Sequence, residues 1–422
     1  MQRNLTTIFT AVKKGTAITL VALSALALNA NAQDTEFKPS GKLWGYGFAD
    51  FAVKTHTDSL NRGGSNQYTG VREGNSMFQF RRLYLGYDYN ISEKFSAEFL
   101  LAAEDNIVPT IYKNTKGLDS AGAASGDLLT NGKFSPYIKL ANIRWKGIWK
   151  GTDLVFGQVA TPSFPMMSEA IWGYRSIERT VSDIRRTPSF DFGTTLQGKF
   201  YNTKDMEFGY NVMVGNGQSA KPENDQFKWF YGDVYAKVFD KHLIIDLYQD
   251  YQRINWTPTW HHDRNMTKLF LAYNGPKLTI GFEGFVNTLM GDIKATGTDG
   301  KTYYRTTNAY AFSLFTRGRI YKDKLGFFAR YDKYDPSGNI SAVTGTGTAF
   351  TSYSALTSQY DPKTRENFVT AGIDFTPVKN VHIMPNIWYN NYDNASATKY
   401  TSNAASNYDL VARLTIYYIY GK

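Results

Sequence analysis

The chain has 422 residues, no Cys and a formal net charge of +10 at pH 7. The absence of Cys excludes disulfide frameworks, thiolate metal sites and Cys nucleophiles. Aromatic residues make up 16% of the sequence, with 30 Tyr and 28 Phe, and the mean hydropathy is −0.40, a composition that favours a β protein over a disordered chain or a bundle of membrane-spanning helices.

The first 32 residues have the three regions of a secretory signal peptide. A basic region comes first, an apolar region covers 17–28, and Ala30-Asn31-Ala32 is a small-residue cleavage site. An N-terminal membrane anchor is the alternative, but the apolar run is short for a spanning helix. We therefore expect export and cleavage before Gln33. Cleavage would remove three of the 47 basic residues and leave 44 − 37 = +7 for the mature chain.

From residue 42 onward the chain repeats segments of about ten residues in which polar and apolar residues alternate. In 409–420, for example, Leu410, Leu414 and Ile416 share one face, and Asp409 and Arg413 share the other. A period of two with one apolar face predicts strands of which one side meets an apolar medium. The predicted strands are 42–53, 76–89, 94–104, 137–148, 152–160, 190–201, 206–216, 228–239, 242–253, 267–274, 277–288, 306–320, 325–334, 365–376, 381–390 and 408–420.

The connections between these strands alternate in length. The short ones are 90–93, 149–151, 202–205, 240–241, 275–276, 321–324 and 377–380. The long ones are 54–75, 105–136, 161–189, 217–227, 254–266, 289–305, 335–364 and 391–407. This sorting predicts an all-β transmembrane antiparallel barrel of about sixteen strands, with short periplasmic turns and long extracellular loops.

A soluble Greek-key sandwich is the alternative fold, but it has no reason to sort its loops by length. Too few large apolar residues alternate onto the second face to build a soluble core. Aromatic residues also gather at strand ends, as in the aromatic girdles of membrane barrels. These are Tyr87, Tyr89, Trp145, Tyr389, Tyr418 and Tyr420. We divide the chain into a signal peptide (1–32), a short N-terminal segment (33–41) and a barrel domain (42–422).

The third long loop, 161–189, is charged and aromatic, whereas the loops 105–136 and 335–364 are rich in small residues. A sixteen-stranded barrel has an aqueous lumen, and a loop folded into it would narrow the pore. We expect this loop to form the constriction. The residues assigned to the constriction and to anion attraction are Arg175, Arg179, Arg185, Arg186 and Glu178. The alternative is that these arginines pair with Glu169, Glu178, Asp183 and the barrel wall.

Strand parity assigns both bases and acids to the inner face. The predicted basic lining is Arg82, Arg144, Lys146, Lys199, Lys237, Lys268, Arg317, Arg319, Arg330 and Arg413. The predicted acidic lining is Glu98, Asp191, Asp233, Asp246, Glu283, Asp332, Asp374 and Asp409. Opposed rows of charge would impose an electric field across the pore on passing solutes. Guanidinium groups can also form hydrogen bonds with phosphate or carboxylate groups. The alternative is a set of wall-to-wall ion pairs that stiffen the barrel.

Two regions resemble the outer-membrane porin O/P family, the phosphate-selective porins. The resemblance lies in Phe156-Gly157-Gln158, Thr161-Pro162, Ile177-Glu178-Arg179-Thr180, Asp191-Phe192-Gly193 with Gly198, and in the strand segment 80–87. It covers about forty residues around the fifth strand and implies a sixteen-stranded porin, commonly trimeric, that passes small anions passively. Val159-Ala160 stand where the family often has a Lys before the Thr-Pro pair.

Two other classes of function are alternatives. A barrel hydrolase needs a His beside a nucleophile, and we expect His261-His262-Asp263 to lie in a surface loop without a third metal ligand. Glycan binding would use exposed loop aromatics. The candidates for stacking on sugars are Trp256, Trp260, Tyr353 and Tyr360. Nucleic-acid binding is disfavoured because no basic cluster accompanies the aromatics.

We therefore predict a porin of the Gram-negative outer membrane, a homotrimer that lets small hydrophilic solutes, preferentially anions, diffuse passively. No enzymatic activity, cofactor or metal is expected. The alternative is a gated barrel for the binding and uptake of a glycan or another substrate.

Overall fold

A computed structural model describes residues 37–58, 68, 71–104, 136–185, 187–336, 350–355, 364–394 and 407–421. The predicted signal peptide (1–32) and Arg186 lie outside the described residues. All strands fall in Ser40–Lys422, one of two compact units of the chain. No helix in the described ranges is long and apolar enough to span a membrane.

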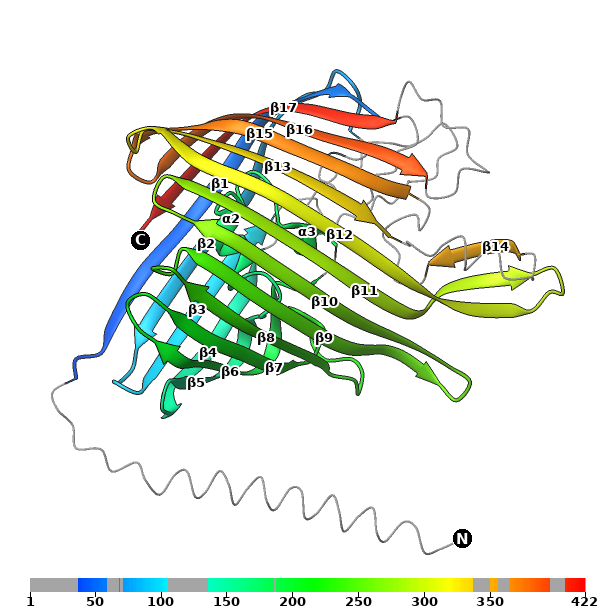
Figure 1. Cartoon of the computed structure of the whole chain (residues 1–422), viewed down its shortest axis with the longest axis horizontal. Helices are drawn as coiled ribbons and strands as arrows, with labels where there is room; N and C mark the ends of the chain where they lie inside the picture. Colours follow the sequence, from blue (N-terminus) through cyan, green and yellow to red (C-terminus); the bar gives the residue numbers. More distant parts are fainter. Residues whose placement is uncertain are drawn as a thin grey trace, which may run out of the picture. The chain divides into compact units, whose positions relative to one another are not determined.

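Sixteen of the described strands form a closed antiparallel barrel (Figure 1). Each strand pairs with the next one, and the last strand pairs with the first over Gly45↔Tyr420 to His56↔Leu410, which closes the sheet. The barrel strands are β1 (Ser40–His56), β2 (Ser76–Asn90), β3 (Phe95–Glu104), β4 (Tyr137–Trp149), β5 (Thr152–Ala160), β6 (Phe190–Asn202), β7 (Glu207–Gly215), β8 (Trp229–Val238), β9 (Leu243–Thr257), β10 (Trp260–Asn274), β11 (Leu278–Gly297), β12 (Thr302–Tyr321), β13 (Leu325–Asp335), β15 (Thr364–Val378), β16 (Val381–Asn394) and β17 (Tyr408–Tyr420).

The predicted alternation is confirmed in the burial of the strands. Along β17, Leu414 and Ile416 are exposed on the outer face, whereas Asp409, Arg413 and Thr415 are buried on the inner face. An apolar outer face suits lipid, and closure of the sheet gives the strand backbones hydrogen-bond partners where water is absent. All sixteen predicted strands correspond to barrel strands, so the predicted fold class is confirmed.

Two predicted long connections are wrong. The segment 254–266 is a hairpin in which β9 ends at Thr257 and β10 begins at Trp260, and in 289–305 the strands β11 and β12 continue to Gly297 and from Thr302. The apolar alternation stops in these segments, but pairing continues because an antiparallel ladder outside lipid needs no apolar face. The hairpin of β11 and β12 projects beyond the neighbouring strands, and β14 (Phe350–Ala355), which was not predicted, pairs with β11 there (Figure 1).

The seven predicted short connections are present as tight turns at one end of the barrel, which we call the short-turn end. Aromatic rings stack there on the outer surface. The ring centroids of Tyr87 and Tyr89 lie 6.0 Å apart, and those of Tyr418 and Tyr420 lie 6.5 Å apart. The Tyr420 ring covers Gly45 of the neighbouring strand, where an added Cβ would lie 2.2 Å from the Tyr420 hydroxyl. The predicted aromatic girdle is therefore present at this end.

The outer faces of β11 and β12 give a direct test of the membrane assignment. Leu314 is 51% exposed near the middle of the predicted span, and Leu278 is exposed beside a short turn. Replacing Leu314 by Arg should lower the free energy of unfolding by roughly 2–4 kcal/mol, because the charge would enter the hydrocarbon, and Leu278→Arg should cost only about 0–1 kcal/mol. Urea unfolding in phospholipid vesicles measures both values. Equal losses for the two variants would contradict this placement.

Candidate pore

The segment 161–189, which we call the lumen loop, connects β5 to β6 and contains α2 (Ser168–Trp172) and α3 (Val181–Ile184). Its two ends are tied together, since the Thr161 amide donates to the Ser189 carbonyl (3.1 Å) and the Thr161 hydroxyl to the Pro188 carbonyl (2.6 Å). Gly173, at φ 69°, ends α2, and the Thr180 side chain caps α3. These local features turn the chain back on itself within about thirty residues.

The lumen loop contacts strands on the far side of the barrel. The Trp172 ring lies 5.2 Å from that of Phe315 on β12, and the Tyr174 hydroxyl donates to Asp374 on β15 (2.9 Å). The Trp388 indole on β16 donates to Glu178 (3.0 Å). A loop that leaves the wall between β5 and β6 can reach these strands only through the interior. The prediction that the loop folds into the lumen is confirmed.

An apolar cluster holds the loop against the wall. Trp172 is fully buried among Phe270, Phe315, Phe328 and Met384, which face inward from β10, β12, β13 and β16. The inner face therefore carries more large apolar residues than predicted. The signal was present, because Phe270, Phe315 and Phe328 occupy inner positions of the alternation that a water-filled wall would give to polar residues.

Arginines of the wall donate to backbone carbonyls of the loop. Arg317 Nε donates to the Ile171 carbonyl (3.0 Å), Arg413 Nη2 to Ile177 (3.0 Å) and Arg330 Nη1 to Arg179 (2.5 Å). Parity had assigned these three arginines to the lumen lining. Arg330 is also paired with Asp332, and Arg413 donates to Asn386 (2.8 Å).

Arg81, which the sequence analysis missed, donates to the Ser176 carbonyl and pairs with Asp50. A β-bulge explains the omission. Phe48 pairs with Arg82, but the next residue, Ala49, pairs with Phe80, so that Arg81 is an extra residue in β2. Both Arg81 and Arg82 are therefore buried on the inner side, where strict alternation allows one of them.

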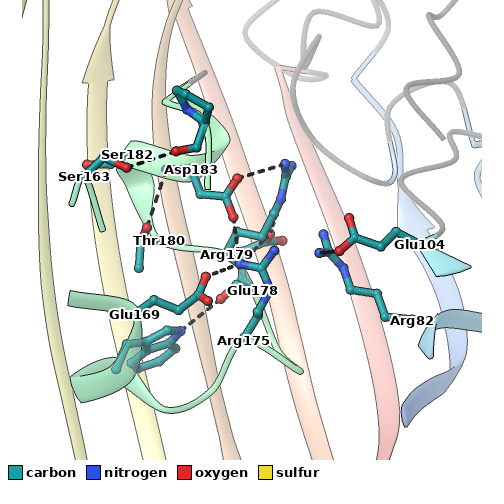
Figure 2. A network of polar contacts seen from close by, with 12 residues as sticks. Arg82, Glu104, Ser163, Glu169, Arg175, Glu178, Arg179, Thr180, Ser182 and Asp183 are labelled. Carbon is teal, nitrogen blue, oxygen red and sulfur yellow. Dashed lines mark hydrogen bonds and ion pairs between the residues drawn. The ribbon is translucent and has the colours of Figure 1, made fainter. Parts of the chain in front are cut away.

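The described arginines of the predicted constriction lie within ion pairs, and two of them, Arg175 and Arg179, are drawn in Figure 2. Arg175 contacts Glu169 and Asp183, the latter at 2.8 Å, and Arg179 lies 3.7 Å from both Glu178 and Asp183. Arg185 pairs with Glu366 on β15 (2.9 Å), and its guanidinium lies 3.9 Å from the centre of the Tyr334 ring. The geometry of these three arginines is the paired arrangement described by the alternative interpretation.

Burial and neighbouring charge have opposite effects on the loop carboxyl groups. Burial raises their pKa, and neighbouring guanidinium groups lower it. Burial by itself would raise the pKa of Glu178, but the guanidinium groups of Arg179 and Arg413 outweigh it and hold this pKa below its ordinary value. Burial likewise opposes ionisation of Asp183, and Arg175 and Arg179 lower its pKa. For Glu169 burial prevails over Arg175 and raises the pKa. The neighbouring guanidinium groups therefore favour the ionised forms of Glu178 and Asp183.

The remaining predicted basic residues lie on the wall facing the loop or nearer the short-turn end. Arg82 pairs with Glu104 (3.1 Å), beside the charged side of the loop in Figure 2. Arg144 pairs with Asp153 (2.9 Å) and Lys199 with Glu207 (3.1 Å). Arg319 is exposed, two residues from Arg317 on β12.

A cavity of about 560 Å³ lies at the short-turn end, between the wall from β4 to β8 and Met166 and Met167 of the loop. Its charged lining is Arg144, Asp153, Lys199, Glu207 and Lys237. A second cavity of about 340 Å³ lies between β1, β17 and the loop residues 165–176. The loop therefore leaves space beside two separate stretches of the wall.

The predicted acidic residues also have partners within the barrel. Lys268 pairs with Asp246 (3.2 Å), Asn211 donates to Asp233 (2.8 Å), and Ser182 of the loop donates to Glu283. His382 lies 2.9 Å from Asp374, and Lys54 pairs with Asp409 (2.6 Å). Much of the inner charge is thus organised as ion pairs and hydrogen bonds across neighbouring strands.

The histidine pair lies in β10 rather than in a surface loop, because the predicted loop 254–266 is a hairpin. His261 lies 3.1 Å from Asp263, and His262 lies 3.3 Å from Asp292. Within the described ranges no group of three or more His, Asp or Glu is arranged to hold a metal ion. Among the stacking candidates, Trp260 packs on Tyr304 with ring centroids 4.5 Å apart, Trp256 is half exposed, and Tyr360 lies outside the described residues.

Comparisons with known proteins place the barrel among outer-membrane porins by fold. No family model and no curated protein matches the chain. Among solved structures, the chain is similar to the outer membrane channel DcaP of Acinetobacter baumannii (10% identity, TM-score 0.55, 92% of this chain and 99% of that chain). It is also similar to an anion-selective porin from Comamonas acidovorans (13%, 0.53, 91% and 100%) and to OmpT of Vibrio cholerae in a trimer form (9%, 0.50, 91% and 100%). The chain has the closed sixteen-stranded fold of these outer-membrane proteins.

The apolar contact between loop and wall predicts a large contribution of Trp172 to stability. Truncation of this fully buried ring by Trp172→Ala should lower the free energy of unfolding by about 3–5 kcal/mol. Trp256→Ala is the matched control, because Trp256 is 50% exposed and its loss should change this energy by less than about 0.5 kcal/mol. Guanidinium unfolding in vesicles, followed by fluorescence, compares the two. Similar effects would mean that the loop adds nothing to the barrel.

Proposed function

We propose that the mature chain is a passive channel of the Gram-negative outer membrane for small hydrophilic solutes. The observation that carries this proposal is the asymmetric placement of the lumen loop. Its apolar side is packed on β10, β12, β13 and β16, whereas the charged residues of its other side keep some exposure, between 12 and 19% for Glu169, Arg175, Arg179 and Asp183. A partly hydrated charged strip inside a closed barrel is a route for polar solutes.

The route that we propose runs between the charged side of the loop and the wall of β2, β3 and β4. The wall contributes Arg82, Glu104 and Lys139, of which Glu104 contacts both bases. With Glu178 counted in the loop strip, this region contains four basic and four acidic residues. The basic residues are Arg82, Lys139, Arg175 and Arg179, and the acidic residues are Glu104, Glu169, Glu178 and Asp183. Facing rows of opposite charge create an electric field across the route. This field orients water and retards apolar solutes, which cannot interact with it. In this proposal the paired arginines filter by polarity.

A modest anion preference arises nearer the short-turn end. Glu207 lies 3.1, 3.2 and 3.7 Å from the ammonium groups of Lys199, Lys237 and Lys241. One carboxylate among three ammonium groups leaves an excess of two positive charges beside the larger cavity. The charge of +7 on the mature chain, the resemblance to phosphate-selective porins and the similarity to an anion-selective porin agree with this preference. We propose small anions, phosphate included, as favoured solutes and a homotrimer as the assembly.

The dense packing of the interior favours a second candidate, a gated barrel that opens for a glycan or another substrate. Tyr231, Tyr248 and Lys268 face inward from β8, β9 and β10 and are almost fully buried. A wide and permanently open pore would leave such side chains in contact with water. Electrical recording separates the two candidates, because an open channel conducts without any added substrate.

The proposal predicts steady single-channel currents from the mature chain, residues 33–422, in a planar bilayer, with an anion-biased reversal potential under a KCl gradient. Arg175→Gln should shift the permeability ratio toward cations by up to about fivefold, because one unit charge at 4 Å in water changes the energy of an ion by roughly 1 kcal/mol.

The control is Arg253→Gln. Arg253 pairs with Asp263 near the β9–β10 hairpin and not with a charged residue of the lumen loop, so its loss should leave the permeability ratio unchanged. A stably inserted but silent wild-type barrel would overturn the open-channel proposal and support the gated one.

A further inference from the structure

The wall arginines that contact loop carbonyls differ in chemistry from the paired arginines of the loop. Resting on the proposed channel function, we infer that Arg81, Arg317, Arg330 and Arg413 are positioning residues that hold the lumen loop against one side of the barrel and thereby set the free cross-section of the pore. They come from β2, β12, β13 and β17, and their acceptors are the carbonyls of residues 176, 171, 179 and 177. The inference excludes a role for these residues as anion-attracting groups.

The acceptors fall within nine consecutive residues of the loop. Carbonyls 171 to 179 extend from the last turn of α2 to the residue before Thr180, the N-cap of α3, and this stretch of backbone makes few helical hydrogen bonds of its own. A buried carbonyl without a partner is costly, so an external donor stabilises this non-helical stretch in one place. Guanidinium suits the task because its five N–H donors reach a carbonyl and a second acceptor at once.

Burial makes three of these groups poor sites for a passing anion. Arg81, Arg330 and Arg413 are 2, 3 and 4% exposed. Each also lies over an aromatic ring, with distances to the ring centre of 4.9 Å for Arg81 on Phe48, 5.5 Å for Arg330 on Trp172 and 5.6 Å for Arg413 on Tyr68. A guanidinium stacked on a ring and bonded to a carbonyl has little surface left for solute.

Arg317 and Arg319 form a matched pair for testing the inference. They lie two residues apart on the inner side of β12 and carry the same charge, but Arg317 donates to the Ile171 carbonyl and Arg319 is exposed, without a hydrogen bond to any loop residue among the described ones. Removing either charge changes the electrostatics of the lumen similarly. Only the loss of Arg317 should release the loop.

The absence of Cys from the sequence allows a reporter that does not depend on conduction. Ser176 is 3% exposed in the docked loop, and its hydroxyl has no hydrogen-bond partner among the described residues, so Ser176→Cys removes no contact. The rate at which a small water-soluble methanethiosulfonate reagent modifies this thiol in the folded mature chain in vesicles measures how often the loop leaves the wall.

In the Ser176→Cys background, Arg317→Gln and Arg413→Gln should raise the modification rate about tenfold, in keeping with the loss of a charge-assisted hydrogen bond, and Arg319→Gln should leave it unchanged. Arg317→Lys, which keeps the charge but loses the planar donor set, should also raise the rate. Equal rates for the Arg317 and Arg319 variants, or full retention of slow modification by Arg317→Lys, would overturn the inference.

Modification rates are compared only for variants that keep the heat-sensitive gel mobility of a folded barrel. If Arg413→Gln does not fold, the comparison of the Arg317 and Arg319 variants tests the inference. In bilayers, Arg317→Gln should increase mean conductance and current noise, whereas Arg319→Gln should change neither, and the two variants should shift the reversal potential by similar amounts. A silent wild-type barrel would refute the channel function without affecting the modification rates, so the two failures are distinguishable.

Discussion

Closure of the sheet through the pairing of β1 with β17 is the constraint on which the other features depend. In lipid, a strand edge without a partner would leave a row of amide and carbonyl groups unsatisfied, so the outer face can be apolar only if the sheet has no edge. Closure by sixteen strands also fixes an interior too wide for wall side chains to fill. The lumen loop fills part of this interior. Trp172 and its neighbours there bury an apolar surface that would otherwise face water.

The parts of the fold that follow from periodicity can be predicted from the sequence. The parts that depend on contacts between residues distant in the chain are harder to predict. Alternation located every barrel strand, and the charge of 161–189 singled out the lumen loop. The partners of Arg317, Arg330 and Arg413 are carbonyls contributed by residues more than a hundred positions away, and no local pattern encodes such a contact. Arg81 was missed because one bulge shifts the parity of β2. The hairpins at 254–266 and 289–305 escape prediction because apolar alternation ends in these segments although strand pairing continues.

Charge inside the barrel serves two separable purposes. Where carboxylates and bases alternate at contact distance, as in Glu169, Arg175 and Asp183, the net charge is small and the local field is strong. Where bases outnumber acids, as around Glu207, the proposed channel would keep a longer-range positive potential. Screening reduces the second effect at high salt more than the first, because the ions of the buried strip lie closer together than a Debye length. In the proposed channel, filtering by polarity and attraction by charge would therefore act at different depths of the same pore.

The position of the lumen loop depends on the far wall more than on its own stem. The stem at Thr161 and Ser189 joins the ends of the loop but leaves the direction of the intervening residues open. That direction is set where guanidinium groups meet carbonyls and where Trp172 enters its apolar pocket, both on strands that are distant in sequence. A hydrogen bond donated to a backbone carbonyl fixes the position of the loop independently of the loop side chains. In the proposed channel, substitutions among Arg175, Arg179 and Asp183 would therefore alter the charge of the pore while its width is retained, so that selectivity and conductance could vary separately.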